Sequence, residues 1–280
     1  MRQSRSRFPG RTGHAAFGGG KRVQMTTHDE ILRTRQERID EVHRLQSGRT
    51  ALLVIDMQRG FLEPGAALEV PAGRAIIPNI RKLIEACRRR RFPVIFTQFI
   101  YTTALPCLRG EPFGPEHLPT RPGEPTGFGL PSGNCLVPPE TDSGPNSAEI
   151  VPELAPRPEE LVLRGHTYDK FYGTPLDLAL RSRDIRYLVI AGVVTEVCVN
   201  CTLLSAANRD YRATAVTDGV ASPWPELQEA CFEIWHRKFA RLRTTEEIIA
   251  EIEEGAPAGE LKEKNRSRPK GDRGIPRSER

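Results

Sequence analysis

The strongest constraint on the fold of this chain is a series of short apolar runs in which hydrophobic and polar residues do not alternate. Residues 51–55 (ALLVI) and 187–191 (YLVIA) are the clearest examples. A strand that is buried on both faces has this pattern, whereas a strand with one face in water alternates. The runs therefore predict a parallel sheet that is covered on both sides.

Segments with helical spacing separate these runs. The expected helices are Thr27–Leu45, Ala75–Arg91, Pro175–Arg183, Glu196–Asn208, Pro225–His236 and Thr245–Glu253. The expected strands are Ala51–Ile55, Pro93–Thr97, Leu161–Leu163, Tyr187–Ala191, Ala213–Val216 and Phe239–Leu242. Strands that alternate with helices are joined by right-handed crossovers, which place helices on both faces of one sheet. The sequence thus predicts an α/β fold, a three-layer α/β/α sandwich with a mainly parallel sheet, in a single domain.

The segment 101–158 interrupts this pattern, because it is rich in proline and glycine and has no clear period. Long loops inside a compact domain are usually functional or disordered. Its apolar side chains, among them Phe113 and Phe128, favour a packed lid or an oligomer contact over free disorder. We expect a main domain over 50–254 that contains this insertion, preceded by a helical extension over 27–49.

The two ends of the chain carry its positive charge. The whole chain has a formal net charge of +5. Residues 1–28 contribute +6 and residues 261–280 contribute +5, which leaves residues 29–260 at −6. The basic pI therefore describes the ends, and it gives no reason to expect a nucleic-acid partner.

The composition of the ends predicts disordered basic tails over 1–26 and 255–280, because neither can bury enough apolar surface to fold. An Arg-rich transit peptide is an alternative interpretation of the first residues. A natural start at Met25 is another.

The cysteines and the hydropathy of the chain indicate the cellular compartment in which the protein is expected. The six cysteines, at 87, 107, 135, 198, 201 and 231, show no paired CxxC metal spacing, and the chain shows no secretory signal. Reduced thiols in the cytoplasm are the expected state. The longest apolar runs have about five residues, whereas a membrane helix needs about 20, so no membrane partner is expected.

Two chemically active residues follow predicted strands. In an open parallel sheet, ligands bind beyond the carboxyl ends of the strands. Asp56 directly follows the first strand, and Cys198 lies in the first turn of the helix after residues 187–191. A helix N-terminus stabilises a thiolate, and a neighbouring carboxylate can accept the thiol proton, so the pair predicts a nucleophile with its base. The alternatives are a turn-capping role for Asp56 and a buried structural role for Cys198.

Three motifs in this order resemble the isochorismatase-like cysteine hydrolases, which include nicotinamidase, N-carbamoylsarcosine amidase, ureidoacrylate amidohydrolase and biuret hydrolase. The motifs are residues 51–58 (ALLVIDMQ) with Phe61, residues 168–176 (YDKFYGTPL) and residues 192–199 (GVVTEVCV). The resemblance covers residues 50–252 and implies the three-layer fold already expected. It also implies a homo-oligomer, tetramer or dimer, and a catalytic triad of Asp, Lys and Cys, in which Asp56 and Cys198 match.

The lysine of the triad does not fall where the family places it. The matching position, six residues before Phe171, is Gly165. Three hypotheses follow: Lys170 reaches in from the loop, Arg164 or His166 supplies the charge, or the site lacks a cation. A cation is needed because it lowers the pKa of the thiol and keeps the Asp–Cys pair correctly protonated. We take Lys170 as the third member of the triad.

The resemblance predicts a cysteine-dependent amidohydrolase that cleaves a small linear amide or carbamoyl (ureido-type) C–N bond through a thioester and releases ammonia. Asp56 takes the proton of Cys198 in this scheme. The resemblance also implies a cis peptide at Val193–Val194 and an oxyanion hole made by the backbone N–H groups of Val194 and Cys198. The candidates to line the substrate pocket are Gln58, Phe61, Phe171 and Tyr172.

No cofactor and no metal are expected. Nicotinamidases of this fold hold a metal with an Asp and histidines after the first two strands, and here no histidine lies between His43 and His117. A glycine-rich nucleotide motif is also lacking. The expected partner is a small-molecule amide or ureide. The alternatives are an isochorismatase-type vinyl-ether hydrolase, which Cys198 disfavours because that reaction needs no nucleophile, and a non-catalytic binding or assembly module, suggested by Gly165.

Overall fold

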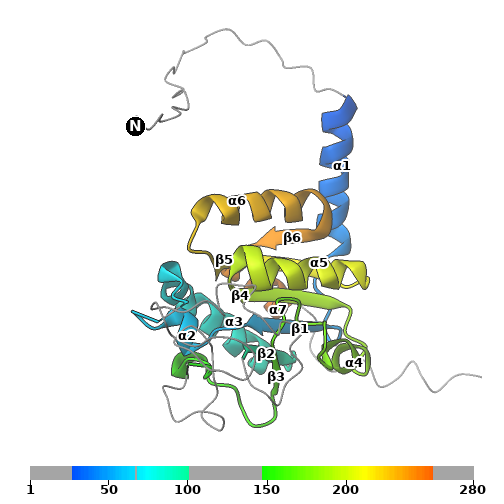
Figure 1. The fold of residues 1–280 in the computed structure, drawn as a ribbon. Helices are drawn as coiled ribbons and strands as arrows, with labels where there is room; N and C mark the ends of the chain where they lie inside the picture. The colour runs from blue at the N-terminus through cyan, green and yellow to red at the C-terminus, as the bar shows by residue number, and fades with distance from the viewer. Residues whose placement is uncertain (1–26, 67, 101–146, 255–280) are drawn as a thin grey trace, which may run out of the picture.

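The computed structural model describes residues 27–66, 68–100 and 147–254, which form one six-stranded sheet between two layers of helices (Figure 1). The strands are β1 (Thr50–Ile55), β2 (Val94–Phe99), β3 (Leu161–Gly165), β4 (Tyr187–Val193), β5 (Arg212–Ala221) and β6 (Ala240–Arg243). Their order is β3-β2-β1-β4-β5-β6, and every neighbouring pair is parallel. The predicted α/β class with a three-layer sandwich is confirmed.

The helices cover the sheet on both faces, as the non-alternating strands require. They are α1 (Thr27–Val42), α2 (Arg59–Leu62), α3 (Ile77–Arg89), α4 (Leu176–Arg181), α5 (Asn200–Asn208), α6 (Pro225–Ile234) and α7 (Thr245–Glu254). On β1, Leu52 and Val54 pack toward α3 and α7, whereas Leu53 and Ile55 pack toward α4, α5 and α6. Within the described ranges, no helix is both long enough and apolar enough to cross a membrane.

Three predicted helices overlap irregular turns that the hydrophobic pattern did not reveal. These turns are η1 (Pro71–Ile76, a 3₁₀ turn), η4 (Thr195–Val199, a π-helical turn) and η5 (Trp235–Phe239, also π-helical). Pro78 lies in the first turn of α3, where its missing N–H leaves no helical bond unmade. A π-helical turn departs from the 3.6-residue period, so periodicity alone cannot locate it.

Much of the predicted insertion and both predicted tails, residues 101–146, 1–26 and 255–280, lie outside the described residues. The last part of the insertion is described, and its irregular backbone is packed against the rest of the domain. Ile150, Val151 and Leu154 are buried in the same hydrophobic core as α3. The N–H of Val151 donates to the carbonyl of Met57 at 3.0 Å. This part of the predicted insertion therefore belongs to the core.

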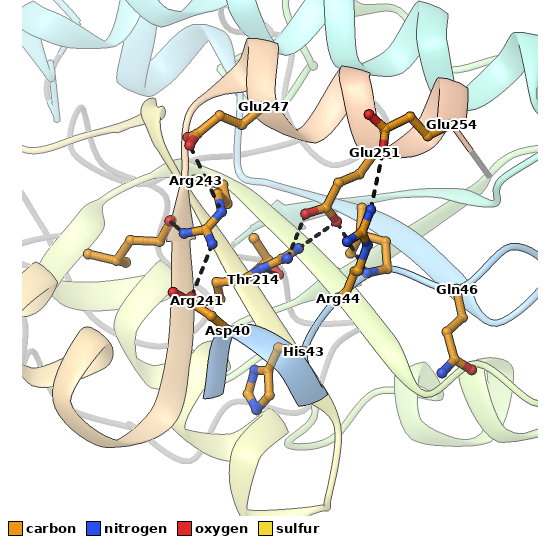
Figure 2. Close-up of polar contacts among 12 residues, drawn as sticks. Asp40, His43, Arg44, Gln46, Thr214, Arg241, Arg243, Glu247, Glu251 and Glu254 are labelled. Atoms are coloured by element: carbon orange, nitrogen blue, oxygen red, sulfur yellow. Dashed lines mark hydrogen bonds and ion pairs between the residues drawn. The ribbon is translucent and has the colours of Figure 1, made fainter. Parts of the chain in front are cut away.

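An ion pair between a buried arginine and a partly buried glutamate joins the edge strand β6 to α7 at the amino end of the sheet (Figure 2). Arg241 is 1% exposed and donates to both carboxylate oxygens of Glu251, with N···O distances of 2.6 and 2.8 Å. The Nε of Arg241 donates to Thr214 Oγ1 at 3.3 Å. Glu251 also accepts the N–H of Leu45, at 3.2 Å. Bidentate geometry with further hydrogen bonds is what a buried charge pair needs.

Candidate active site

Asp56 lies directly after β1, at the carboxyl edge of the sheet and next to the point where the strand order reverses between β1 and β4. The side chain is fully buried, and its Oδ1 accepts a hydrogen bond from Thr97 Oγ1 at 2.6 Å. The same hydroxyl accepts the backbone N–H of Asp56 at 3.2 Å. The φ of Asp56 is 50°, a left-handed conformation that Asp adopts more readily than most residues. Thr97, on β2, thus fixes the orientation of the carboxylate.

Lys170 lies in the loop between β3 and α4 and reaches back to the end of β1. Its Nζ is 2.7 Å from Asp56 Oδ2, and the two side chains are 3% and 0% exposed. Nζ also donates to the carbonyl of Thr167 at 3.0 Å and lies 5.2 Å from the centre of the Phe99 ring. A carboxylate, a carbonyl and an aromatic face therefore hold the ammonium almost entirely out of water.

Cys198 lies in η4, the π-helical turn that follows β4, and it is buried. The peptide bond Val193–Val194, between the strand and the turn, is cis, as the resemblance implied. Thr195 Oγ1 donates to Gln228 Oε1 on α6 at 3.0 Å, which braces the turn. Single π-helical turns are frequent at functional sites. The backbone N–H groups of Val194 and Cys198 stay our candidates for an oxyanion hole.

The three side chains influence one another's protonation. Burial raises the pKa of the Cys198 thiol well above its usual range, the charge of Lys170 lowers it, and Asp56 raises it through its charge and a hydrogen bond. Burial acts to lower the pKa of Lys170, but the charges of Asp56, Cys198 and Asp169 outweigh burial and raise it. The resting site therefore favours an ammonium group at Lys170 and a protonated thiol at Cys198.

The other two candidates for the cation have different partners. Arg164 Nε donates to Gln98 Oε1 at 3.1 Å. His166 is buried, and its ring stacks on Phe99 with a centroid distance of 4.7 Å. Of the three candidates, all within the described ranges, Lys170 is the one whose charged atom lies within ion-pairing distance of the aspartate. The geometry supports the first of the three hypotheses.

Three of the four side chains predicted to line a substrate pocket are used for packing. Gln58 is fully buried, its Nε2 donates to the Phe99 carbonyl at 2.9 Å, and its Oε1 accepts the Phe99 N–H at 2.7 Å. Phe61 and Phe171 are buried in the two hydrophobic cores. Tyr172 is 53% exposed. Gln58 thus joins the ends of β1 and β2, and Tyr172 has the exposure that a substrate contact needs. The assignment of all four residues to a substrate pocket stays a prediction.

Sequence reasoning missed the residues that hold Asp56 and Lys170 in place. The parallel register pairs Val54 with Phe96, which places Thr97 level with Ile55 and so within reach of Asp56, the next residue. Asp169, next to Lys170, accepts a hydrogen bond from Ser205 on α5 at 2.7 Å. Neither the register nor this contact between distant segments leaves a local pattern in the sequence.

A thiol, a carboxylate and an ammonium that meet at the carboxyl edge of a parallel α/β sheet are the arrangement of a hydrolase with a cysteine nucleophile. Across the described part of the chain, no group of three or more His, Cys, Asp or Glu side chains could hold a metal ion. Residues 50–247 match the isochorismatase domain model. The chain belongs to the isochorismatase family and is a cysteine hydrolase of that family, which confirms the resemblance.

Similar proteins include ureidoacrylate amidohydrolase RutB from Pseudomonas syringae pv. syringae (strain B728a), which is 31% identical over 207 residues, 68% of this chain and 79% of that protein. The crystal structure of a cysteine hydrolase from Pseudomonas syringae pv. phaseolicola 1448A superposes with a TM-score of 0.62 at 26% identity, covering 75% of this chain and 95% of that one. N-carbamoylsarcosine amidase from Thermoplasma acidophilum gives a TM-score of 0.52 at 25% identity, covering 70% of this chain and 96% of that one.

Proposed function

We propose that this protein is a cysteine-dependent amidohydrolase that cleaves a small linear amide or carbamoyl (ureido-type) C–N bond and releases ammonia. The observation that carries the proposal is the buried ion pair between Lys170 and Asp56, next to the Cys198 thiol. This pair supplies the cation that Gly165 cannot. The substrate class is supported by two similar proteins, a ureidoacrylate amidohydrolase and an N-carbamoylsarcosine amidase.

The first half of the proposed reaction forms a thioester. Asp56 accepts the proton of Cys198, and the sulfur attacks the carbonyl carbon of the substrate. The backbone N–H groups of Val194 and Cys198 donate to the oxygen as it gains charge, a contribution of about 2.7–4 kcal/mol for one such donor. Asp56 then gives the proton to the departing nitrogen, the C–N bond breaks, and ammonia leaves.

The second half restores the thiol. A water molecule gives a proton to Asp56 as it attacks the thioester carbon, the C–S bond breaks, and the sulfur takes the proton back. The sum is one amide and one water converted to an acid and ammonia. Lys170 stays an ammonium throughout, because its pKa is raised, and it offsets the negative charge that passes between carboxylate and sulfur.

Ammonia release from a panel of linear amides and ureides tests this function. The panel comprises ureidoacrylate, biuret, triuret, N-carbamoyl amino acids, maleamate and nicotinamide. We expect turnover of at least one ureido or carbamoyl compound by the wild type and none by Cys198→Ser at the same concentration. Acid-quenched samples should show an acyl adduct on the wild-type chain by intact mass. No release from any compound, or equal release from the Cys198→Ser variant, contradicts the proposal.

Two other functions are less well supported. Isochorismatase-type vinyl-ether hydrolysis needs no nucleophile, so a thiol hydrogen-bonded to a carboxylate has no use in it. A non-catalytic module was suggested by Gly165, and the position of Lys170 removes the reason for that hypothesis.

We also propose that the protein acts as a homo-oligomer, a tetramer or a dimer. Leu227 and Ile234 on α6 are 42% and 48% exposed, and Ile31 on α1 is 56% exposed. Apolar side chains exposed on helix faces are typical of subunit contacts. Light scattering at micromolar concentration tests this, and a monomeric mass contradicts it. Leu227→Glu combined with Ile234→Glu should lower the mass if α6 is the contact, and Leu178→Glu on α4, 72% exposed, is the matched control.

The proposed partner is thus a small molecule rather than a nucleic acid or a membrane, and the mechanism uses no cofactor. Among the described cysteines, Cys87, Cys198, Cys201 and Cys231 are free. A nucleophilic thiol must stay reduced to act. We therefore propose the cytoplasm as its compartment.

A further inference from the structure

The loop that carries Lys170 is neither helix nor strand, and its own side chains hold its shape. Thr167 Oγ1 donates to the carbonyl of Asp169 at 2.9 Å. The N–H of Phe171 donates to Asp169 Oδ1 at 2.8 Å, and Thr174 Oγ1 donates to the carbonyl of Lys170 at 2.5 Å. The residues on both sides of Lys170 are therefore tied to the rest of the loop.

Helix α5 holds the same loop from outside. Ser205 Oγ donates to Asp169 Oδ2 at 2.7 Å, and the N–H of Lys170 donates to Thr202 Oγ1 at 3.1 Å. Arg209 in turn donates to the Ser205 hydroxyl. Because α5 continues directly from η4, the segment that carries the Cys198 thiol also anchors the loop that brings the ammonium to it.

Asp169 acts through its charge as well as its bonds. Its carboxylate favours the charged form of Lys170, after the larger effects of Asp56 and Cys198. Cys201 is the other ionisable group influenced by both Asp169 and Lys170. Both oxygens of the Asp169 carboxylate accept hydrogen bonds, from Phe171 and from Ser205, so its position is fixed.

We propose that Asp169 is a positioning residue, which, tethered to Ser205 on α5, fixes the loop so that Lys170 meets Asp56 beside the Cys198 thiol. The inference rests on the proposed function, because it takes Lys170 as the cation of the triad. A lysine at Gly165 would project from β3, whose backbone is already held by the sheet. A lysine on an irregular loop needs a tether of its own, because a displacement of about 1 Å at a reacting group can cost about a hundredfold in rate.

Two variants separate the charge of Asp169 from the tether. Asp169→Asn removes the charge and keeps an oxygen for the Phe171 N–H, whereas Ser205→Ala removes the tether and keeps the charge. We expect each variant to lower kcat by up to about a hundredfold and to change KM far less, because Lys170 acts on the reacting groups. Asp169→Asn should also move the alkaline limb of the kcat profile to lower pH, since Lys170 loses a carboxylate that favours its ammonium form.

The matched control is Asp177→Asn. Asp177, on α4, accepts bonds from Arg181 and from Tyr211, both at 2.9 Å. Its replacement removes a carboxylate with two partners but should leave kcat and the pH profile unchanged. Ser205→Thr keeps a hydroxyl and should retain most of the activity that Ser205→Ala loses, so the pair decides the question even if Asp169→Asn does not fold.

The outcomes distinguish the inference from the function on which it rests. Wild-type kcat and pH profile in both Asp169→Asn and Ser205→Ala overturn the inference, while loss of activity in Lys170→Ala still supports the proposed triad. Full activity in Lys170→Ala overturns the assignment of the cation itself, and with it the need for a tether.

Discussion

Two ion pairs, one fully buried and one with a buried arginine and a partly buried glutamate, lie at opposite ends of the parallel sheet. They differ in how completely their charges are matched. At the amino end, Arg241 and Glu251 share two parallel hydrogen bonds, and Thr214 and Leu45 supply further ones. At the carboxyl end, Lys170 makes a single contact with Asp56. That carboxylate also accepts a hydrogen bond from Thr97, and it raises the pKa of the Cys198 thiol.

The difference shows what each pair can do. Removing a charge from water costs several kcal/mol, and a saturated pair such as Arg241–Glu251 offsets that cost while leaving nothing for a further partner. In the other pair, Asp56 Oδ2 forms the ion pair with Lys170 but accepts no hydrogen bond, so it is able to take a proton from the Cys198 thiol. A fully matched pair can hold elements together, whereas an incompletely matched one can move a proton.

Replacing the thiol should have the largest effect on activity of all the substitutions considered. Cys198→Ala and Cys198→Ser should abolish turnover, because the covalent step has no substitute, and should leave the melting temperature near that of the wild type. Ammonia release and thermal melting measure the two effects. More than a few per cent of wild-type activity, with contaminating enzyme excluded, contradicts the thioester mechanism.

The next largest effect is expected at the cation. Lys170→Ala should lower kcat by a few orders of magnitude and raise the pKa of Cys198, because the charge of Lys170 lowers that pKa. Iodoacetamide alkylation against pH measures the shift, with Cys198→Ser as the correction for other thiols. Lys170→Arg should rescue poorly, because a planar guanidinium does not fit where a compact ammonium lies.

Arg164→Ala and His166→Ala are the controls for Lys170 and should be mild. The opposite ranking, with Lys170→Ala near wild type and Arg164→Ala inactive, moves the cation to Arg164. Wild-type activity in all three variants would mean that none of these residues supplies the cation that the family's lysine provides.

Substitutions in the Arg241–Glu251 pair should change the free energy of unfolding and leave kcat unchanged. Glu251→Gln strands the buried charge of Arg241 and should lower the free energy of unfolding by about 3–5 kcal/mol, measured by urea denaturation. The double variant Arg241→Met with Glu251→Leu should recover most of that loss, because no buried charge remains. The kcat per folded molecule should stay at the wild-type value in both, and a fall in kcat contradicts the separation of the two pairs.

Treatment with a chelator should leave the enzyme activity unchanged. The proposed mechanism uses a thiol and a carboxylate and assigns no step to a metal ion. Activity in EDTA should equal that of the untreated enzyme. A loss that added zinc, iron or manganese restores overturns this expectation.

Most of the fold could be predicted because strands covered on both faces are apolar on both faces. What could not be predicted was how far each element runs. The expected strand 213–216 continues as β5 to Ala221, because a register shift opposite Ile190 and Gly192 lets pairing resume beyond Asp218 and Gly219. An Asp-Gly pair predicts a turn from local propensity. Here the pairing with β4 continues the strand beyond it, and that pairing is not visible in the local sequence.

Two of the three residues of the candidate site could be placed from the sequence, and the third could not. Asp56 and Cys198 follow strands, so the order of strands is enough to bring them together. The position of Lys170 depends on contacts with Thr202 and Ser205, which lie far along the chain and leave no periodic signal. The amide of Gln58 is bonded to the backbone of the neighbouring strand, a contact that no local pattern in the sequence indicates.

The central place of β1 also has a consequence for biosynthesis. β1 precedes the other described strands in the chain, yet it pairs with β4 as well as with β2. Until β4 is translated, the nascent chain holds β1 with one unpaired edge, and such edges pair with other chains. Nascent chains stalled before Tyr187 should therefore be protease-sensitive and those stalled after β6 resistant; resistance at both lengths contradicts this. Asp56, after β1, is therefore synthesised long before Cys198, after β4, and the edge of β1 must be kept from pairing with other chains during that interval.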